Sequence, residues 1–208
     1  MQKNTYKGKF IVFEGLDGSG QSTQTNLLGD FLVGKGYEVI LTKEPTKDSE
    51  AGQKIRQVLD KNTQVSPMYL QELFAQDRGE HLDNLIIPAL KEGKMIVSDR
   101  YFFSSFAYGA SSGVEAEELI KLNSEFLMPD LTIILKVRPE VCMERIGKRG
   151  GSQTLFEEAE KLKKVWQTYE TLPRRFENAY IIDGEKSIEK VHENVKALLQ
   201  EKFNIRML

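Results

Sequence analysis

The stretch GLDGSGQST, residues 15–23, restricts the possible folds of this chain more than any other part of its sequence. It follows the apolar run FIVFE and precedes a helical pattern, so a buried strand leads through a glycine-rich turn into a helix. Glycines are needed where backbone N–H groups turn inward around phosphate oxygens, because a side chain would block that approach. The start of the helix adds a partial positive charge. The stretch therefore predicts a phosphate-binding loop.

This loop departs from the usual pattern G-x-x-x-x-G-K-[ST] at one position, where Gln21 replaces the lysine. A lysine places a charge on the β- and γ-phosphates, whereas the glutamine amide offers hydrogen bonds alone. Ser22 still supplies a hydroxyl for Mg²⁺. The competing dinucleotide fingerprint, G-x-G-x-x-G, fits Gly18 and Gly20 but meets Thr23 at its third glycine position. The residues expected to hold the phosphates of a nucleotide are Gly15, Leu16, Asp17, Gly18, Ser19, Gly20, Gln21, Ser22 and Thr23.

Short apolar runs alternate with helical patterns along the whole chain. Each run is rich in Ile, Val, Leu or Phe without strict alternation, which is typical of strands buried on both faces of a parallel sheet. The predicted strands cover residues 9–15, 37–45, 94–100, 130–137 and 179–184. Among the helices, one over 67–91 begins after Ser66 as N-cap, and Ser187 caps the last one. The alternation predicts a doubly wound α/β fold, with residues 1–208 as a single domain.

Charge and cysteine content restrict the partners. The chain has 29 Lys and Arg against 31 Asp and Glu, so it lacks a general basic field for nucleic acid. Its one cysteine, Cys142, excludes an internal disulfide, fits a reducing compartment and is expected as a small core residue on a helix. The first ten residues contain no apolar signal core, and no apolar run approaches the ~18 residues of a membrane span. We expect a cytoplasmic protein without nucleic-acid or membrane partners.

Motifs along nearly the whole chain resemble the thymidylate kinase family. The matching strings are FEGLDGSG, TKEP, IRQVL, LFAQDRGEHL, IPALKEGKMIVSDRY, SSFAY, NSEF followed by PDLTIIL, and IIDGEKSIEKV. The phosphate loop alone is shared by a wider superfamily, whereas SDRY with SSFAY and LFAQDRGEH are specific at this spacing. The resemblance implies a P-loop nucleoside-monophosphate-kinase-like fold of three layers, with a parallel five-stranded sheet flanked by helices and a small lid at about 145–158. It also implies a homodimer that transfers the γ-phosphoryl group of ATP, with Mg²⁺, to dTMP.

The same resemblance assigns residues to the phosphates. Asp99 would hold a Mg²⁺-bound water beside Ser22, and Arg100 would bridge the transferring group. Bacterial-type members supply further cations from the lid, where Arg145 and Arg149 are the candidates, together with Lys148.

For the acceptor, the resemblance implies that Phe74 stacks on thymine and that Arg78 donates to a ring carbonyl. These two residues are four apart, so they share one face of a helix. Arg56 corresponds to the arginine that grips the acceptor monophosphate. Further contacts to the base, the sugar or metal-bound waters are implied for Asp17, Glu44, Ser105 and Tyr108, and Arg100 would also bind the acceptor phosphate.

Three departures from the family pattern leave alternatives open. Gln21 removes the loop charge, and Lys43 stands where an arginine would bind phosphate bidentately. Gly109 replaces a glutamine and so removes a possible thymine contact. The alternatives are a nucleotide-binding, catalytically weak paralogue, suggested by Gln21, and a kinase of another deoxynucleotide, suggested by Gly109.

Overall fold

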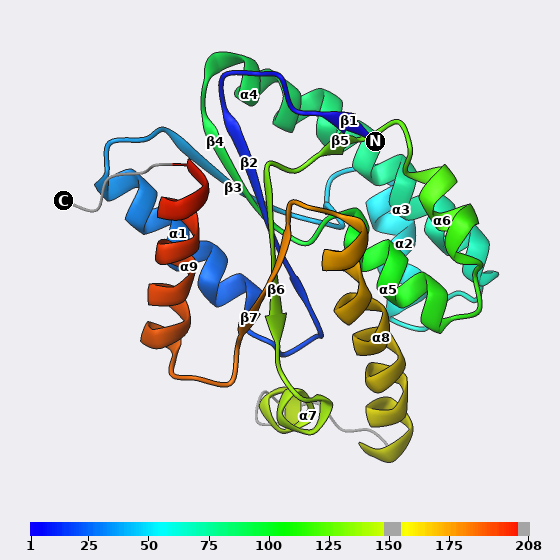
Figure 1. Cartoon of the computed structure of the whole chain (residues 1–208). Coiled ribbons are helices and arrows are strands. Elements are labelled where there is room, and N and C mark those ends of the chain that lie inside the picture. The colour runs from blue at the N-terminus through cyan, green and yellow to red at the C-terminus, as the bar shows by residue number, and fades with distance from the viewer. Residues whose placement is uncertain (148–154, 204–208) are drawn as a thin grey trace.

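A parallel sheet of five strands forms the centre of the computed structural model, which describes residues 1–147 and 155–203 (Figure 1). Its strands are β2 (Lys9–Gly15), β3 (Val39–Lys43), β4 (Met95–Asp99), β6 (Leu131–Lys136) and β7 (Ala179–Asp183), in the order β3-β4-β2-β6-β7. The five predicted strands are thus confirmed, each within two residues at either end. A small parallel pair, β1 (Gln2–Lys3) with β5 (Leu127–Met128), was not predicted.

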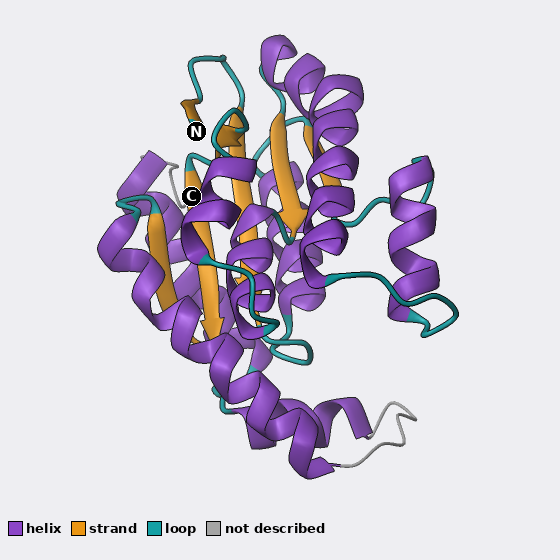
Figure 2. Cartoon of the chain, turned by 90° about the vertical axis from the view of Figure 1, so that its right-hand side faces the viewer, coloured by secondary structure: helices purple, strands orange, loops and turns teal. Residues whose placement is uncertain are grey.

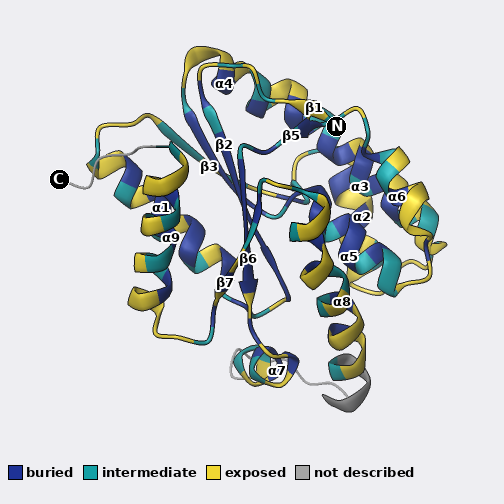
Figure 3. Ribbon diagram, in the orientation of Figure 1, coloured by how far each residue is buried: buried dark blue, intermediate teal, exposed yellow. Residues whose placement is uncertain are grey.

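Strand β2 shows why the apolar runs do not alternate. Phe10 and Val12 point to the core on one face of the sheet, and Ile11 and Phe13 to the core on the other. All four side chains are fully buried. Burial of each such side chain contributes roughly 1.5–3 kcal/mol to stability. A polar residue on either face of this strand would therefore lower the stability of the fold. Figure 3 shows the buried strands between helices whose outer surfaces are exposed.

Helices cover both faces of the sheet, which gives the predicted three layers (Figures 1 and 2). One face carries α1 (Gln21–Gly34) and α9 (Ile188–Phe203). The other carries α4 (Ile87–Glu92), α5 (Phe102–Ser111) and α8 (Leu155–Arg175). Farther from the sheet, the elements are α2 (Glu50–Leu59), α3 (Pro67–His81), the π-helical turn η1 (Leu82–Ile86) and α6 (Ala116–Leu122). Strand β6 leads into α7 (Pro139–Gly147), where Cys142 is buried as expected.

The predicted helix starts are confirmed, but the helix predicted over 67–91 is divided. The Ser66 hydroxyl accepts from the N–H of Tyr69 at 3.2 Å, and the Ser187 hydroxyl accepts from that of Lys190 at 3.2 Å. The long helix is α3 as far as His81, then η1, then α4. Among the described residues, no helix is both long and apolar enough to cross a membrane.

The order of the strands places the site. The chain leaves β2 toward β3 and β4 on one side and later adds β6 and β7 on the other, so β2 lies next to a topological switch point. Ligands of open parallel sheets bind outside the carboxyl ends of the strands at such a point. The phosphate loop follows β2 there. The predicted lid at about 145–158 includes the end of α7 and the start of α8, and its residues 148–154, among them Lys148 and Arg149, lie outside the described part.

Candidate active site

The phosphate loop connects β2 to α1 through three glycines with left-handed backbone conformations. Gly15, Gly18 and Gly20 have φ angles of 147°, 85° and 101°, which other residues rarely adopt. At Gly18 there is also a steric reason, since a Cβ atom would lie 2.7 Å from the carbonyl oxygen of Cys142 in α7. The glycines therefore set the path of the loop and allow α7 to approach it closely.

Gln21 folds back into this loop. Its Nε2 donates to the carbonyl of Gly15 at 3.0 Å, and its Oε1 accepts from the Ser19 hydroxyl at 3.1 Å. The side chain is 5% exposed. A neutral amide thus stabilises the loop at the position where the usual pattern has a charged group.

Asp99, at the end of β4, accepts hydrogen bonds from two side chains. Its Oδ2 accepts from the Ser22 hydroxyl and from Nζ of Lys43, the latter at 2.7 Å. Lys43 ends the neighbouring strand β3, and the two residues are paired in register, which explains why they meet. Asp99 is buried, whereas the Lys43 side chain is 56% exposed.

The same corner fits Mg²⁺. Ser22 and Asp99 present hard oxygen atoms side by side, the ligand type that Mg²⁺ prefers. Within the described residues, no group of three or more His, Cys, Asp or Glu could hold a metal alone. A site with so few protein oxygens is compatible with Mg²⁺, because this ion is usually bound through only one or two carboxylates together with waters and substrate phosphates.

Arg100 links the phosphate loop to the next helix. Its guanidinium donates to the carbonyl of Gly15 at 3.2 Å, to the Ser104 hydroxyl at 2.8 Å and to Asp17 at 2.7 Å. Burial alone would lower the pKa of Arg100, but Asp17 and further acidic groups outweigh it and hold that pKa well above its usual value. The guanidinium also lies 5.3 Å from the ring centroid of Tyr108, whose hydroxyl bonds to Asp17. Arg100 is therefore a fixed positive charge at the loop.

Glu14 lies directly behind these groups and was not predicted as a site residue. Its fully buried carboxylate accepts from the N–H groups of Tyr101 and Ser104 and from the hydroxyls of Ser104 and Tyr169. Burial raises the pKa of Glu14 to about 7, against the opposing effects of Arg100 and these hydrogen bonds. The available sequence signal is a charged residue inside the apolar run FIVFE, because such a residue is rarely buried without partners.

A second pocket lies beside the loop, between α3, α5 and the end of β3. It is lined by Asp17, Glu44, Pro45, Leu59, Leu70, Gln71, Phe74, Arg78, Arg100, Tyr101, Ser104, Ser105, Tyr108, Ser112 and Lys161. Seven predicted acceptor residues are thus brought together: Asp17, Glu44, Phe74, Arg78, Arg100, Ser105 and Tyr108. Arg56, whose side chain is exposed on α2, is not among the lining residues. Its role stays a prediction.

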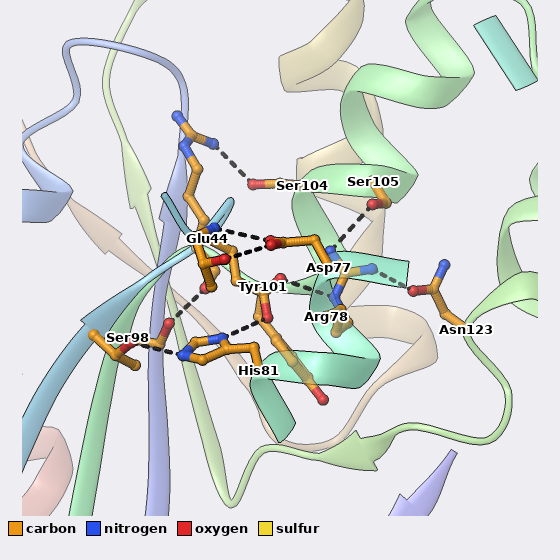
Figure 4. A network of polar contacts seen from close by, with 12 residues as sticks. Glu44, Asp77, Arg78, His81, Ser98, Tyr101, Ser104, Ser105 and Asn123 are labelled. Carbon is orange, nitrogen blue, oxygen red and sulfur yellow. Dashed lines mark hydrogen bonds and ion pairs between the residues drawn. The ribbon is translucent and has the colours of Figure 1, made fainter. Parts of the chain in front are cut away.

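Arg78 is held from three sides at the inner end of this pocket (Figure 4). It donates to Glu44 at 2.9 Å, to Asn123 at 2.6 Å and to Ser105 at 3.3 Å. The side chain is 1% exposed, and the other Glu44 oxygen lies 3.2 Å from Nδ1 of His81. Asn123 and His81 were not predicted as site residues, although both lie in strings that match the family pattern, NSEF and LFAQDRGEHL, which is the signal that could have found them. The network fixes the guanidinium of Arg78, and with it a planar set of N–H donors, at one place in the pocket.

A third pocket lies on the other side of the loop. Arg145 lies there, within 3.4 Å of the carbonyl oxygens of Gly18 and Ser19 and 3.3 Å from that of Gly184. Residues after β7 and the start of α9 complete the wall: Gly184, Lys186, Ser187, Ile188 and Val191. The loop itself forms part of a further pocket, here called the phosphate pocket, which is lined by Asp17, Gly18, Gly20, Gln21, Ser22, Thr23, Lys43, Asp99 and Arg100. Gly18, Gly20 and Thr23 line both the phosphate pocket and the pocket that holds Arg145.

A glycine-rich phosphate loop at the switch point of a five-stranded parallel sheet, with a pocket on either side, defines the class of P-loop kinase folds. The family model described as Thymidylate kinase matches residues 13–195. A probable thymidylate kinase of Pyrococcus horikoshii is 40% identical over 95% of this chain and 98% of its own length. The thymidylate kinase of Caldicellulosiruptor saccharolyticus is 40% identical over 94% and 97%, respectively. The chain belongs to the thymidylate kinase family.

Proposed function

We propose that the protein transfers the γ-phosphoryl group of ATP to dTMP, forming ADP and dTDP for dTTP synthesis. The observation that carries this proposal is that Asp17 and Arg100 line both the phosphate pocket and the neighbouring pocket. A donor phosphate and an acceptor phosphate would therefore meet at one guanidinium. Phosphoryl transfer requires mainly in-line positioning and neutralisation of charge, and a fixed arginine between the two phosphates contributes to both.

On the donor side, residues 15–23 hold the phosphates and Arg145 closes the pocket for the nucleoside. Ser22 and Asp99 hold Mg²⁺, which neutralises charge on the phosphates when it is bound. Gln21 shapes the loop, and Lys43 supplies the positive charge that Gln21 lacks. Support for this last role is that Lys43, Gln21, Ser22 and Asp99 line one pocket.

On the acceptor side, Phe74 stacks on thymine and Arg78 donates to a ring carbonyl. Ser105 and Tyr108 contact the base and the sugar, and Asp17 and Glu44 lie near the sugar. The fixed Arg78 fork supports this assignment, because it favours a carbonyl oxygen over an amino group. The lid around 145–158, with Arg149, is proposed to add cations during closure.

The direct test is ADP release by the purified protein with MgATP and a series of acceptors: dTMP, dUMP, dCMP, dGMP and thymidine. We expect dTMP-dependent release, weaker use of dUMP and little use of the others. No release above background with any acceptor would instead indicate the catalytically weak paralogue. A preference for dCMP, dGMP or thymidine would show that the acceptor is wrong.

A cytoplasmic homodimer is also proposed. Tyr69 in α3 and Leu59 in α2 are large apolar side chains, exposed by 45% and 57%. Burial of such side chains between two copies is favourable, which supports an interface through these helices. Light scattering of the purified protein tests the oligomeric state, and a monomer at all concentrations would contradict it.

A further inference from the structure

Gln71 is a buried amide in the acceptor pocket that the proposed reaction does not yet use. Its side chain lines the pocket and is 4% exposed. Its Oε1 is fully buried, and no hydrogen-bond partner exists for it among the described residues. A buried polar atom without a partner costs roughly 1–3 kcal/mol, so the position requires an explanation.

The helix places Gln71 in line with the two predicted base contacts. Residues 71, 74 and 78 are three and four apart, so Gln71, Phe74 and Arg78 lie on one face of α3. All three line the same pocket. Gln71 is therefore one turn from the ring of Phe74, on the side away from Arg78.

Helix α5 forms the opposite wall and leaves room for the amide. A Cβ atom at Gly109 would lie 3.2 Å from Cδ of Gln71, so a side chain at position 109 would crowd the amide. One turn earlier on α5, Ser105 accepts from Arg78 at 3.3 Å. The pocket is thus lined by Arg78 and Ser105 and, farther along the same helices, by Gln71, whose amide lies against Gly109.

We propose that Gln71 is a specificity-determining residue that reads the N3–H edge of a 4-oxo-pyrimidine base. This rests on the proposed function, because it needs a pyrimidine nucleotide in the pocket. Thymine and uracil present an N3–H donor between two carbonyl acceptors. An amide accepts from N3–H and donates to the adjacent 2-carbonyl, while Arg78 donates to the 4-carbonyl.

Cytosine does not fit this arrangement. Its N3 and its 2-carbonyl are both acceptors, so the amide oxygen would face a lone pair, and its 4-amino group would face the donors of Arg78. Oε1 of Gln71 has no hydrogen-bond partner among the described residues, so an N3–H donor satisfies it whereas an acceptor at N3 does not. The ligand then supplies the partner that the free protein lacks.

Gln71→Met tests the proposal, because methionine has a similar length and volume but cannot pair with the base. We expect a higher Tm for the free protein, since the variant removes an unpaired buried amide. We expect the Kd for dTMP, measured by calorimetry, to rise about tenfold and the dTMP to dCMP ratio of kcat/KM to fall about tenfold, with kcat within about threefold. Gln76→Met is the matched control, because Gln76 lies exposed on the same helix, and it should change none of these.

An unchanged dTMP affinity and an unchanged dTMP to dCMP ratio in Gln71→Met would overturn the proposal. If that variant does not melt cooperatively, Gln71→Asn answers the question, because its shorter amide keeps the polarity but retracts from the base. Wild-type affinity in Gln71→Asn would equally overturn it. A wild-type protein that neither binds nor phosphorylates dTMP would refute the proposed function itself. If the wild type phosphorylates dTMP and the Gln71 variants bind and discriminate as the wild type does, only this inference is refuted.

Discussion

We propose that Gln21 and Lys43 share the role of the single lysine in the usual phosphate loop, with Gln21 holding the loop and Lys43 supplying the charge. Gln21 donates one amide N–H to Gly15 and accepts from Ser19 through its oxygen, so its side chain is held in the loop and brings no charge to a ligand. Lys43 contacts Asp99 at 2.7 Å in the same pocket and is half-exposed, so its ammonium can move to a phosphate. A charged donor forms hydrogen bonds about twice as strong as a neutral one.

A double-mutant cycle tests this division. We expect Lys43→Gln to lower kcat about 10²-fold, because it removes the compensating charge. Gln21→Lys alone should change kcat less than about fivefold, whereas the double variant should recover at least about tenfold over Lys43→Gln. Steady-state kinetics of ADP release measure all four proteins. Lys47→Gln, an exposed lysine four residues away, is the control, and no recovery in the double variant would rule out Lys43 as the substitute.

Glu14 should make the stability of the protein depend on pH in an unusual direction. Its folded pKa of about 7 lies above its ordinary pKa of 4.5, so the native state binds more protons than the unfolded state between these pH values. The stabilising contribution is therefore fully present below about pH 4.5 and is lost as the pH rises through about 7. For an ordinary paired carboxylate, stability is instead lost on acidification.

Glu14→Gln should remove this dependence. Relative to the variant, we expect the wild type to lose about 2 kcal/mol in free energy of unfolding between pH 5 and pH 8. Urea denaturation at both pH values measures the difference. Glu177→Gln, at an exposed glutamate, should run parallel to the wild type, and parallel curves for Glu14→Gln would contradict the raised pKa.

Single residues of the site differ in how far sequence can predict them. The phosphate loop, Asp99 and Arg100 follow strands whose apolar runs are unmistakable, so their common location could be inferred. Glu14 reaches Tyr169 across 155 positions of the chain, and Arg78 reaches Asn123 across 45. No local pattern encodes such contacts, because they depend on how α8 and the end of α6 pack.

Among the elements, the segment 67–91 shows where periodicity is insufficient. Its apolar stripe predicts one helix, yet the structure inserts the π-helical turn η1 immediately before α4. Pro88 explains the break, because it lacks an N–H and its ring clashes with the carbonyl four residues earlier. A π turn accommodates one extra residue and relieves that clash. The apolar pattern alone does not register this change of hydrogen bonding.

The start of α3 provides a test at this scale, because α3 carries Gln71, Phe74 and Arg78. Ser66→Ala removes the hydroxyl that accepts from the Tyr69 N–H. We expect a loss of about 1 kcal/mol in free energy of unfolding, and Ser66→Asp should stay within about 0.5 kcal/mol of the wild type. Urea titrations measure both. Equal losses in the two variants would show that the cap contributes no hydrogen bond of its own.

For the molecule as a whole, sequence predicted a doubly wound parallel sheet but not the order of its strands. Buried apolar runs specify that a strand lies inside a sheet, and not which strand lies beside it. The observed order puts β4 and β6 on either side of β2. Asp99 at the end of β4 and the loop after β2 become neighbours for that reason, and the two ligand pockets open on opposite sides of the loop.

This arrangement predicts how a linked ligand should bind. The pocket that holds Arg145, proposed for the donor, shares Gly18, Gly20 and Thr23 with the phosphate pocket. The phosphate pocket in turn shares Asp17 and Arg100 with the proposed acceptor pocket beside α3. Adenosine and thymidine joined by a chain of four phosphates, the number carried by ATP and dTMP together, should therefore occupy all three at once. Because the second nucleoside binds at a high effective concentration, we expect a Kd at least about 10²-fold below that of dTMP.

Calorimetric competition shows whether the linked compound occupies both nucleoside pockets or only one. The linked compound should displace both ATP and dTMP, whereas adenosine and thymidine joined by a single phosphate cannot span the pockets and should bind no more tightly than dTMP. Displacement of only one nucleotide would mean that the pockets do not form one continuous path. Arg100→Gln should weaken the four-phosphate compound more than it weakens dTMP alone, because the linked chain passes the guanidinium with phosphates of both halves.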